Sequence, residues 1–273
     1  MCTKLKESLF FADSFNVCKK NNIYIWNALS VGLFAGSSFV MLMATSWFLG
    51  VYWAGVFSIG LAMAQQMFTI GCFCVRRYQA SDVDEVYKFN AYLKARFVTC
   101  ALMLIIGVFW ILRGLPNDVA FLNDAKSHVF LWLLLYKASE SFSDVLGGRY
   151  QQMGRFDISC KIMFFKTLSS LISFCVGIYF IRNLSWALFL SFIVHVLLSV
   201  LLDGRMFSRF EMYLQDLRLN STFLLLLACL PLAIDSFLRM YINNGSKFAI
   251  DAIMDKAVSY THLRAHETEA DLV

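Results

Sequence analysis

The sequence predicts an all-α polytopic membrane protein, and its composition, its repeated apolar runs and the charges between those runs all indicate this class. The chain of 273 residues is 59% hydrophobic and 16% charged, with a mean hydropathy of +0.62. Soluble domains average about 45–50% apolar and about 25% charged residues. The basic residues behind the net charge of +5 lie between apolar runs, so they indicate membrane topology and not nucleic acid binding.

Seven apolar runs are long enough to cross a bilayer, which takes about 17–25 helical residues. Residues 1–22 are polar, and the run after them is too long for the core of a signal peptide. We therefore expect a cytoplasmic N-terminus followed directly by the first spanning helix. The predicted spans lie at about 23–48, 52–75, 97–113, 129–147, 162–181, 184–202 and 221–243.

The Lys and Arg residues between the spans set the predicted orientation. Fifteen of them lie in the segments on the N-terminal side of the membrane, and four lie in the loops on the other side. Cytoplasmic loops carry such an excess of positive charge. We therefore expect a multi-pass protein of the plasma or inner membrane, with the linker 203–220 in the cytoplasm.

Small residues and cysteines in the spans have simple structural explanations. Gly32 and Gly36 have a small-xxx-small spacing, and such residues let membrane helices approach closely, so close packing is expected there. Cys72 and Cys74 form C-x-C, and no Cys–His grouping has the spacing of a zinc site. We expect buried thiols, with no metal and no cofactor.

The fourth run is unusual because Lys137, Glu140 and Asp144 lie on one face of its predicted helix. A charge at membrane depth costs a few kcal/mol on insertion scales, so this face is expected to meet protein or water. Such groups commonly mark a substrate pathway. The alternative is an ion-paired cluster that locks the helix to a neighbour, with Lys137 and Glu140 neutralising each other.

Two more spans carry ionisable residues. Asp235 and Arg239 are i, i+4 partners in the seventh run, one turn after Pro231, which can break the helix. They form either part of the pathway or a self-satisfied pair near the outer interface. We expect His195 to be a packed core histidine, with a proton carrier as the alternative, and Lys166 to extend to the cytoplasmic interface.

Four arginines are predicted to form a cytoplasmic basic rim. Guanidinium groups suit phosphate groups, so this rim can form a cytoplasmic gate, which Asp144 can join with Arg149. The alternative is that these arginines only set topology and attract anionic lipid. The rim consists of Arg76, Arg77, Arg149 and Arg155.

Residues 257–273 differ in character from the rest of the chain. The string VSYTHLRAHETEADLV, from Val258 to Val273, has no apolar period. Its first eleven residues resemble the translation of a sequencing-library adapter, so we expect this tail to be non-native and the protein to be a C-terminally truncated fragment. For the same reason, we do not expect His262 and His266 to bind a metal.

Several stretches together resemble a known family of transporters. Residues 54–82 end in a segment of pattern R-x-Y-Q-x-S-D, and they are preceded by NALSVGLFAGSSFVMLMATSWFLG at 27–50. ESFSDVLGGRYQQMGRFDISCK follows at 140–161, and NNGSKFAIDAIMD at 243–255. In order and spacing, these stretches resemble the Wzx-type lipopolysaccharide and capsule flippases of the multidrug/oligosaccharidyl-lipid/polysaccharide exporter superfamily. Gly245, Ser246 and Phe248 depart from the family's Asn-x-Pro-Lys-Tyr-Ala-Ile-Asp.

The resemblance implies a transporter of two six-helix lobes that moves undecaprenyl-diphosphate-linked oligosaccharide to the outer leaflet by alternating access, with a coupling ion as a further candidate partner. Residues 23–202 would form the first lobe, and 221–256 would open the second. The alternatives are a multidrug or cation antiporter of the same superfamily, or an integral membrane glycosyl- or acyltransferase. Loops of at most about 20 residues without a catalytic constellation argue against an enzyme.

Overall fold

The computed structural model is an all-α polytopic membrane protein. It describes residues 20–82, 86–113, 125–209 and 219–253, and within these ranges there is no strand. Six of the described helices are long and apolar enough to cross a membrane. The helices are α2 (Lys20–Leu49), α3 (Val51–Cys72), α4 (Val75–Ser81), α5 (Phe89–Arg113), α6 (Ala125–Gln152), α7 (Phe156–Ile181), α8 (Leu184–Arg209) and α9 (Leu219–Ile253).

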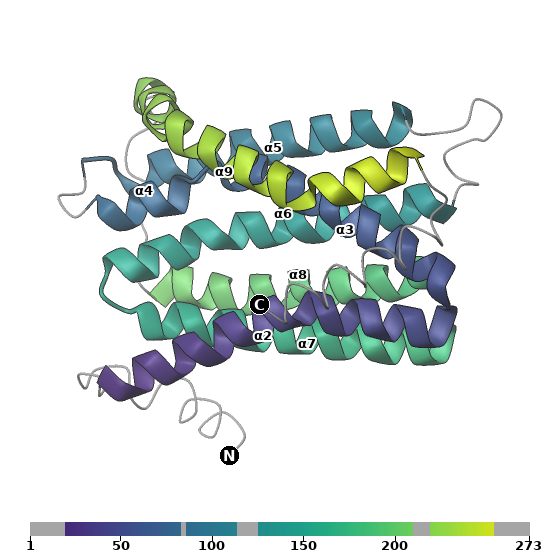
Figure 1. Cartoon of the computed structure of the whole chain (residues 1–273). Coiled ribbons are helices and arrows are strands. Elements are labelled where there is room, and N and C mark those ends of the chain that lie inside the picture. Colours follow the sequence, from purple (N-terminus) through teal and green to yellow (C-terminus); the bar gives the residue numbers. More distant parts are fainter. Residues whose placement is uncertain (1–19, 83–85, 114–124, 210–218, 254–273) are drawn as a thin grey trace, which may run out of the picture.

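Helix α6 is the centre of the arrangement. Helices α2, α7 and α8 lie on one side of it, and α3, α5 and α9 lie on the other (Figure 1). Helix α6 is as long as the spanning helices. It is not one of the six that are apolar enough to cross a membrane, because it carries charged and polar residues. Its contacts with α3, α4, α5, α7 and α8 surround it with protein, which explains how the bundle accommodates it.

The turns between helices alternate between the two ends of the bundle, as the sequence predicts. The start of α2, helix α4, the α6–α7 turn and the start of α9 lie at one end, on the left in Figure 1. The α2–α3 and α7–α8 turns lie at the opposite end. At the α2–α3 turn, Gly50 has φ 88°, a left-handed conformation that only glycine adopts without strain.

The small residues of α3 pack closely, whereas those of α2 do not. A Cβ atom added at Gly60 would lie 2.6 Å from the Phe130 ring of α6, so α3 and α6 depend on this glycine for their approach. Gly32 and Gly36 on α2 have no heavy atom within 4 Å of an added Cβ. The prediction of close packing at Gly32 and Gly36 is therefore wrong, because the neighbouring helices contact other faces of α2.

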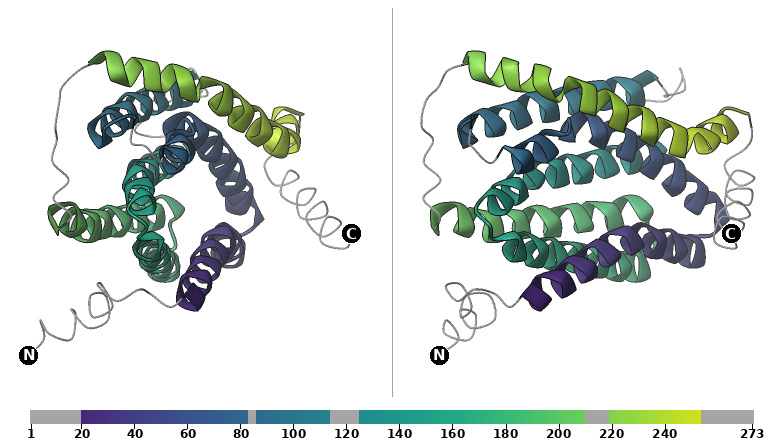
Figure 2. Two further views of the ribbon diagram at one scale, coloured as in Figure 1. Left: turned by 90° about the vertical axis from the view of Figure 1, so that its left-hand side faces the viewer. Right: turned by 60° about the vertical axis from the view of Figure 1, so that its left-hand side comes forward.

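Most of the helices extend further than the apolar runs predicted, and α5 begins at Phe89, eight residues before its run. Helix α8 continues to Arg209, so the first residues of the predicted linker 203–220 are helical. Helix α9 passes through Pro231 without ending, although it bends along its length (Figure 2). A proline removes one backbone hydrogen bond, which a long helix tolerates as a kink. The adapter-like residues 257–273 lie outside the described residues.

Candidate functional site

A cavity of about 240 Å³ lies inside the bundle, between α2, α3, α6, α7 and α8. Most of its polar lining comes from α6, α7 and α8, while α2 and α3 contribute phenylalanine rings. The cavity reaches the end of the bundle where α4 lies. We call it the charged cavity, and its lining includes Phe34, Phe68, Arg76, Glu140, Ser143, Asp144, Lys166, Thr167, His195 and Asp203.

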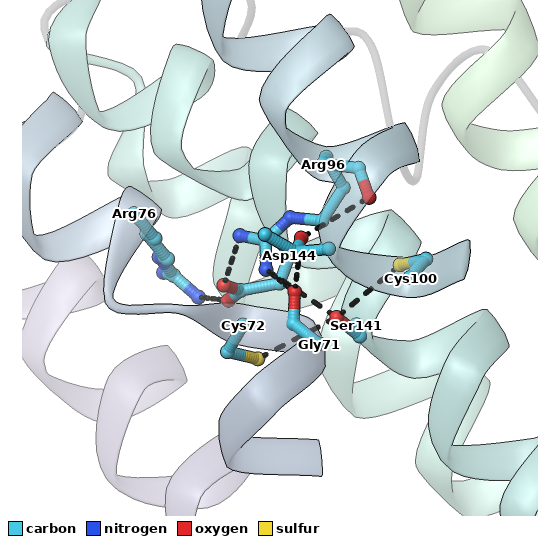
Figure 3. A network of polar contacts seen from close by, with 8 residues as sticks. Gly71, Cys72, Arg76, Arg96, Cys100, Ser141 and Asp144 are labelled. Atoms are coloured by element: carbon cyan, nitrogen blue, oxygen red, sulfur yellow. Dashed lines mark hydrogen bonds and ion pairs between the residues drawn. The ribbon is translucent and has the colours of Figure 1, made fainter. Parts of the chain in front are cut away.

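Asp144 of α6 holds two arginines from two other helices (Figure 3). Its Oδ1 atom accepts from Arg76 Nη1 at 2.8 Å, and its Oδ2 atom accepts from Arg96 Nη2 at 3.1 Å. The Arg96 side chain is fully buried, with 0% exposure. Because charge-assisted bonds are roughly twice as strong as neutral ones, Asp144 ties α4 and α5 to α6.

Arg96 also completes the C-terminal end of α3. Its Nη1 atom donates to the Gly71 carbonyl at 2.8 Å, and the Thr99 hydroxyl donates to the same oxygen at 2.8 Å. The last carbonyls of a helix lack intrahelical partners, and a cation there is favourable. The chain then turns into α4 through Phe73 and Cys74, which have φ 45° and 54°. The buried arginine therefore fixes the α3–α4 break.

Lys137 and Glu140 pair within α6, as the spacing predicts. Lys137 Nζ donates to Glu140 Oε2 at 2.6 Å, and the two side chains are 8% and 15% exposed. The ammonium group also lies 5.2 Å from the centre of the Phe34 ring and 5.3 Å from that of Phe68. Aromatic faces attract a cation at such distances. Glu140 lines the charged cavity together with these two rings, so the ion pair lies at the edge of the cavity, against α2 and α3.

Lys166 and Asp203 form a second buried pair, between α7 and α8. Lys166 Nζ lies 2.9 Å from Asp203 Oδ2, and the side chains are 6% and 7% exposed. The Ser143 hydroxyl of α6 donates to Asp203 Oδ2 at 2.7 Å and also contacts Lys166. The prediction that Lys166 extends to the cytoplasmic interface is wrong, because Asp203 offers the ammonium group a partner inside the bundle.

His195 is buried beside this second pair. Its Nδ1 atom lies 2.9 Å from the Ser139 hydroxyl, and its ring packs against Tyr136 with centres 4.9 Å apart. The predicted packed histidine is thus confirmed, and it also lines the charged cavity. The lining therefore presents hydroxyl, imidazole, carboxylate, ammonium and guanidinium groups within an apolar bundle.

The segment R-x-Y-Q-x-S-D forms α4 and the residue that ends it. Asp82 accepts from the Val86 amide at 2.9 Å, the Tyr87 amide at 3.1 Å and the Tyr92 hydroxyl at 2.7 Å. Burial alone would raise the pKa of Asp82, but these hydrogen bonds outweigh it and hold the pKa below its ordinary value. The resulting stabilisation is present above the ordinary carboxyl pKa and is lost as the pH falls through the lowered pKa. Asp82 therefore anchors α4 next to the cavity.

The four predicted rim arginines do not form one cluster. Only Arg76 lines the charged cavity. Arg77 is exposed, Arg149 donates to Gln152, and Arg155 pairs with Asp157 of α7 at 3.2 Å. The arginines that bond to the Asp144 carboxylate are Arg76 and Arg96, and the gate between Asp144 and Arg149 stays a prediction.

Asp235 and Arg239 form the predicted i, i+4 pair at 2.9 Å, but they lie outside the charged cavity. Their side chains are 45% and 75% exposed. Asp235 stands at the middle of the segment Thr222–Ala249, which is long and apolar enough to cross a membrane. Helix α9 turns its other side to α3, where Gln66 donates to the Phe237 carbonyl at 3.2 Å.

Arg96 and Asp203 are the two site residues that sequence reasoning misses. Each stands directly beside an apolar run, Arg96 before 97–113 and Asp203 after 184–202. Such positions are typical of loop residues at the membrane surface. The helices extend beyond the runs and carry both side chains into the bundle. The signal that could have found them is a charged residue within one turn of an apolar run, when another span carries a residue of opposite charge that it could pair with.

No known protein family, curated protein or solved structure matches this chain. The resemblance to polysaccharide flippases therefore stays a prediction. Chemically, the charged cavity can exchange hydrogen bonds with hydroxyl groups and can pair with phosphate oxygens through Arg76 and Lys166.

Proposed function

We propose that the protein is a membrane transporter that flips undecaprenyl-diphosphate-linked oligosaccharide to the outer leaflet for surface polysaccharide biosynthesis. The observation that carries this proposal is the charged cavity inside an otherwise apolar bundle. Ionisable groups within membrane spans face a bundle interior or a water-filled cavity and mark pathways for substrates or ions. The N-terminus lies in the cytoplasm in this proposal, because the end of the bundle with α4 carries most of the loop arginines and lysines.

The lining of the charged cavity suits a ligand that combines hydroxyl groups with phosphate. Cations and carboxylates occur together around it, in the pairs Arg76–Asp144 and Lys166–Asp203, and the Ser143 hydroxyl bonds to the second pair. Sugar hydroxyls both donate and accept hydrogen bonds, so they can engage groups of either sign. A phosphate can displace a carboxylate from its cation at similar distance.

The cavity of about 240 Å³ is smaller than the 300–1,000 Å³ of most ligand sites, so transport requires it to open. Alternating access supplies this step in transporters built from two repeats, with the substrate between them. In our proposal, α2 to α8 form the first lobe and α9 opens the second. The open face of Gly32 and Gly36 and the exposed Asp235–Arg239 pair are the surfaces that the second lobe would cover.

A cation or multidrug antiporter of the same architecture is the second candidate. Coupling by cations requires carboxylates that are available to a proton or a metal ion. In the charged cavity, each of the three carboxylates, Glu140, Asp144 and Asp203, already has a cationic partner within 3.1 Å. This pairing favours the flippase over the antiporter.

Export of surface polysaccharide by variants of the full-length protein tests the proposal. Glu140→Gln and Lys137→Met are expected to abolish export, and an immunoblot of the membrane fraction normalises export to the amount of protein that reaches the membrane. Lys94→Met on α5 removes an ammonium group outside the cavity and serves as the matched control. Normal export by both α6 variants would remove the charged cavity from the pathway and contradict the proposal.

A further inference from the structure

A second pocket, of about 650 Å³, lies at the opposite end of the bundle from α4. It is bounded by the α2–α3 turn, the start of α6 and the α7–α8 turn. We call it the aromatic pocket, and it is lined by Leu49, Trp53, Ala125, His128, Trp132, Arg182, Asn183, Leu184, Ser185, Trp186 and Phe189. We propose that the aromatic pocket binds sugar rings of the glycan by stacking them on tryptophan. The proposal rests on the proposed function for the identity of that glycan.

The tryptophans of the aromatic pocket come from three different helices. Trp53 belongs to α3, Trp132 to α6 and Trp186 to α8. The Phe189 ring joins two of them, with its centre 4.7 Å from that of Trp132 and 5.6 Å from that of Trp186. Aromatic rings at such separations pack favourably and hold one another in place. The pocket therefore presents a preformed aromatic wall.

Trp47 differs from the tryptophans of the aromatic pocket because it points outward and does not line that pocket. It lies near the same end of the bundle, on α2, and is 86% exposed. Tryptophans of the membrane interface point outward in this way. Trp53 and Trp132 are only partly exposed and line a cavity instead, while Trp186 lines the same cavity and is 58% exposed. Anchoring at the interface accounts for Trp47 but not for Trp53 and Trp132, which converge on one space.

The α7–α8 turn adds fixed polar groups to the rim of the aromatic pocket. Asn183 Oδ1 accepts from the Ser185 and Trp186 amides at 3.0 and 3.3 Å, and this caps the start of α8. Arg182 precedes it with φ 50° and is exposed. A sugar has apolar C–H faces and a hydroxyl edge, so its faces match the rings and its edge matches the rim. Small-ligand sites show this division between an apolar lining and a few polar groups.

An anionic lipid headgroup is the competing occupant, since Arg182 carries a positive charge at the pocket. Binding of a headgroup depends mainly on the cation, whereas binding of a sugar depends mainly on the rings. Four aromatic side chains and one guanidinium line the pocket, and its volume of about 650 Å³ falls within the range of small-molecule sites. The lining therefore favours the sugar.

The test measures binding of soluble oligosaccharide to the full-length protein in nanodiscs by titration calorimetry. The probe is the oligosaccharide released by mild acid from the surface polysaccharide of the producing strain. Trp186→Ala and Trp132→Ala are expected to weaken binding at least tenfold, while Trp132→Phe retains most of it. Trp47→Ala serves as the control and leaves the affinity unchanged.

Three results of the binding experiment would overturn the proposal, and a fourth would replace the sugar with a lipid headgroup. The three are an absence of binding to the unsubstituted protein, an unchanged affinity in Trp132→Ala and Trp186→Ala, and equal losses in Trp47→Ala. If phosphatidylglycerol in the nanodisc competes with the probe, and Arg182→Gln but not Trp186→Ala removes that competition, the pocket is a lipid site. Normal export by Glu140→Gln together with tryptophan-dependent binding would contradict the proposed function and leave the sugar site standing.

Discussion

Two ion pairs of this protein have similar spacing but opposite surroundings. Lys137 and Glu140 of α6 are three residues apart, and their side chains are 8% and 15% exposed. Asp235 and Arg239 of α9 are four residues apart, and they are 45% and 75% exposed. Both pairs lie within predicted membrane spans. The difference arises because five helices contact α6, while α9 packs mainly on α3 and α5.

The comparison shows that the neighbours of an intramembrane charge decide what the charge can do. On α6, each charged side chain finds a partner, and the surrounding helices close a cavity around the partners. On α9, the pair satisfies only itself, at the middle of its span. A charge at that depth is costly when it faces lipid. The α9 pair therefore marks a surface that another helix or water can cover. The α6 pair is already enclosed by the other helices of the bundle.

The largest loss of stability is expected when Asp144 is replaced. Asp144→Asn leaves Arg96, which has 0% exposure, without its carboxylate, and removing one partner of a buried pair typically costs about 3–5 kcal/mol. Thermal unfolding in detergent measures the loss. The double variant Arg96→Met/Asp144→Leu removes both charges and is expected to recover part of the stability. A single variant as stable as the parent would contradict the role of Asp144 as the link between α4, α5 and α6.

A somewhat smaller loss is expected for the pair between α7 and α8. Asp203→Asn leaves Lys166 buried without a carboxylate, although the Ser143 hydroxyl still contacts it, so we expect a loss of about 2–3 kcal/mol. Lys166→Met/Asp203→Leu should be more stable than Asp203→Asn alone in the same unfolding experiment. If Lys166 instead extends to the interface, Asp203→Asn will have no measurable effect.

The smallest effect is expected on α9. Asp235→Asn breaks a pair that the described helices leave open, and an i, i+4 pair that water reaches contributes only about 0.3–0.5 kcal/mol. Unfolding of the 273-residue chain in detergent should therefore hardly change. A loss above about 2 kcal/mol would show that the pair is covered by protein in this chain, and the contrast with α6 would disappear.

The sequence predicts the spans well because length and hydropathy determine them, and the charged face of α6 is visible in Lys137, Glu140 and Asp144. It does not reveal the partners of that face. Arg96 and Asp203 stand at the edges of apolar runs, where a basic or acidic residue is typical of a loop, and only the continuation of α5 and α8 carries them inside. Helix α4 is also missed, because its start depends on the left-handed turn at Phe73 and Cys74 and on the arginine that holds the Gly71 carbonyl.

Export by the double variant Lys137→Met/Glu140→Gln, in the full-length protein, tests whether the charged pair of α6 serves transport. Replacing both members of a buried pair with uncharged residues of similar size is often neutral for stability, so the variant is expected to reach the membrane at its normal level. We predict that its export of surface polysaccharide is lost, because the cavity charges serve transport. Normal export by the double variant, with a loss only in the single variants, would show that the pair serves folding alone and would contradict the account.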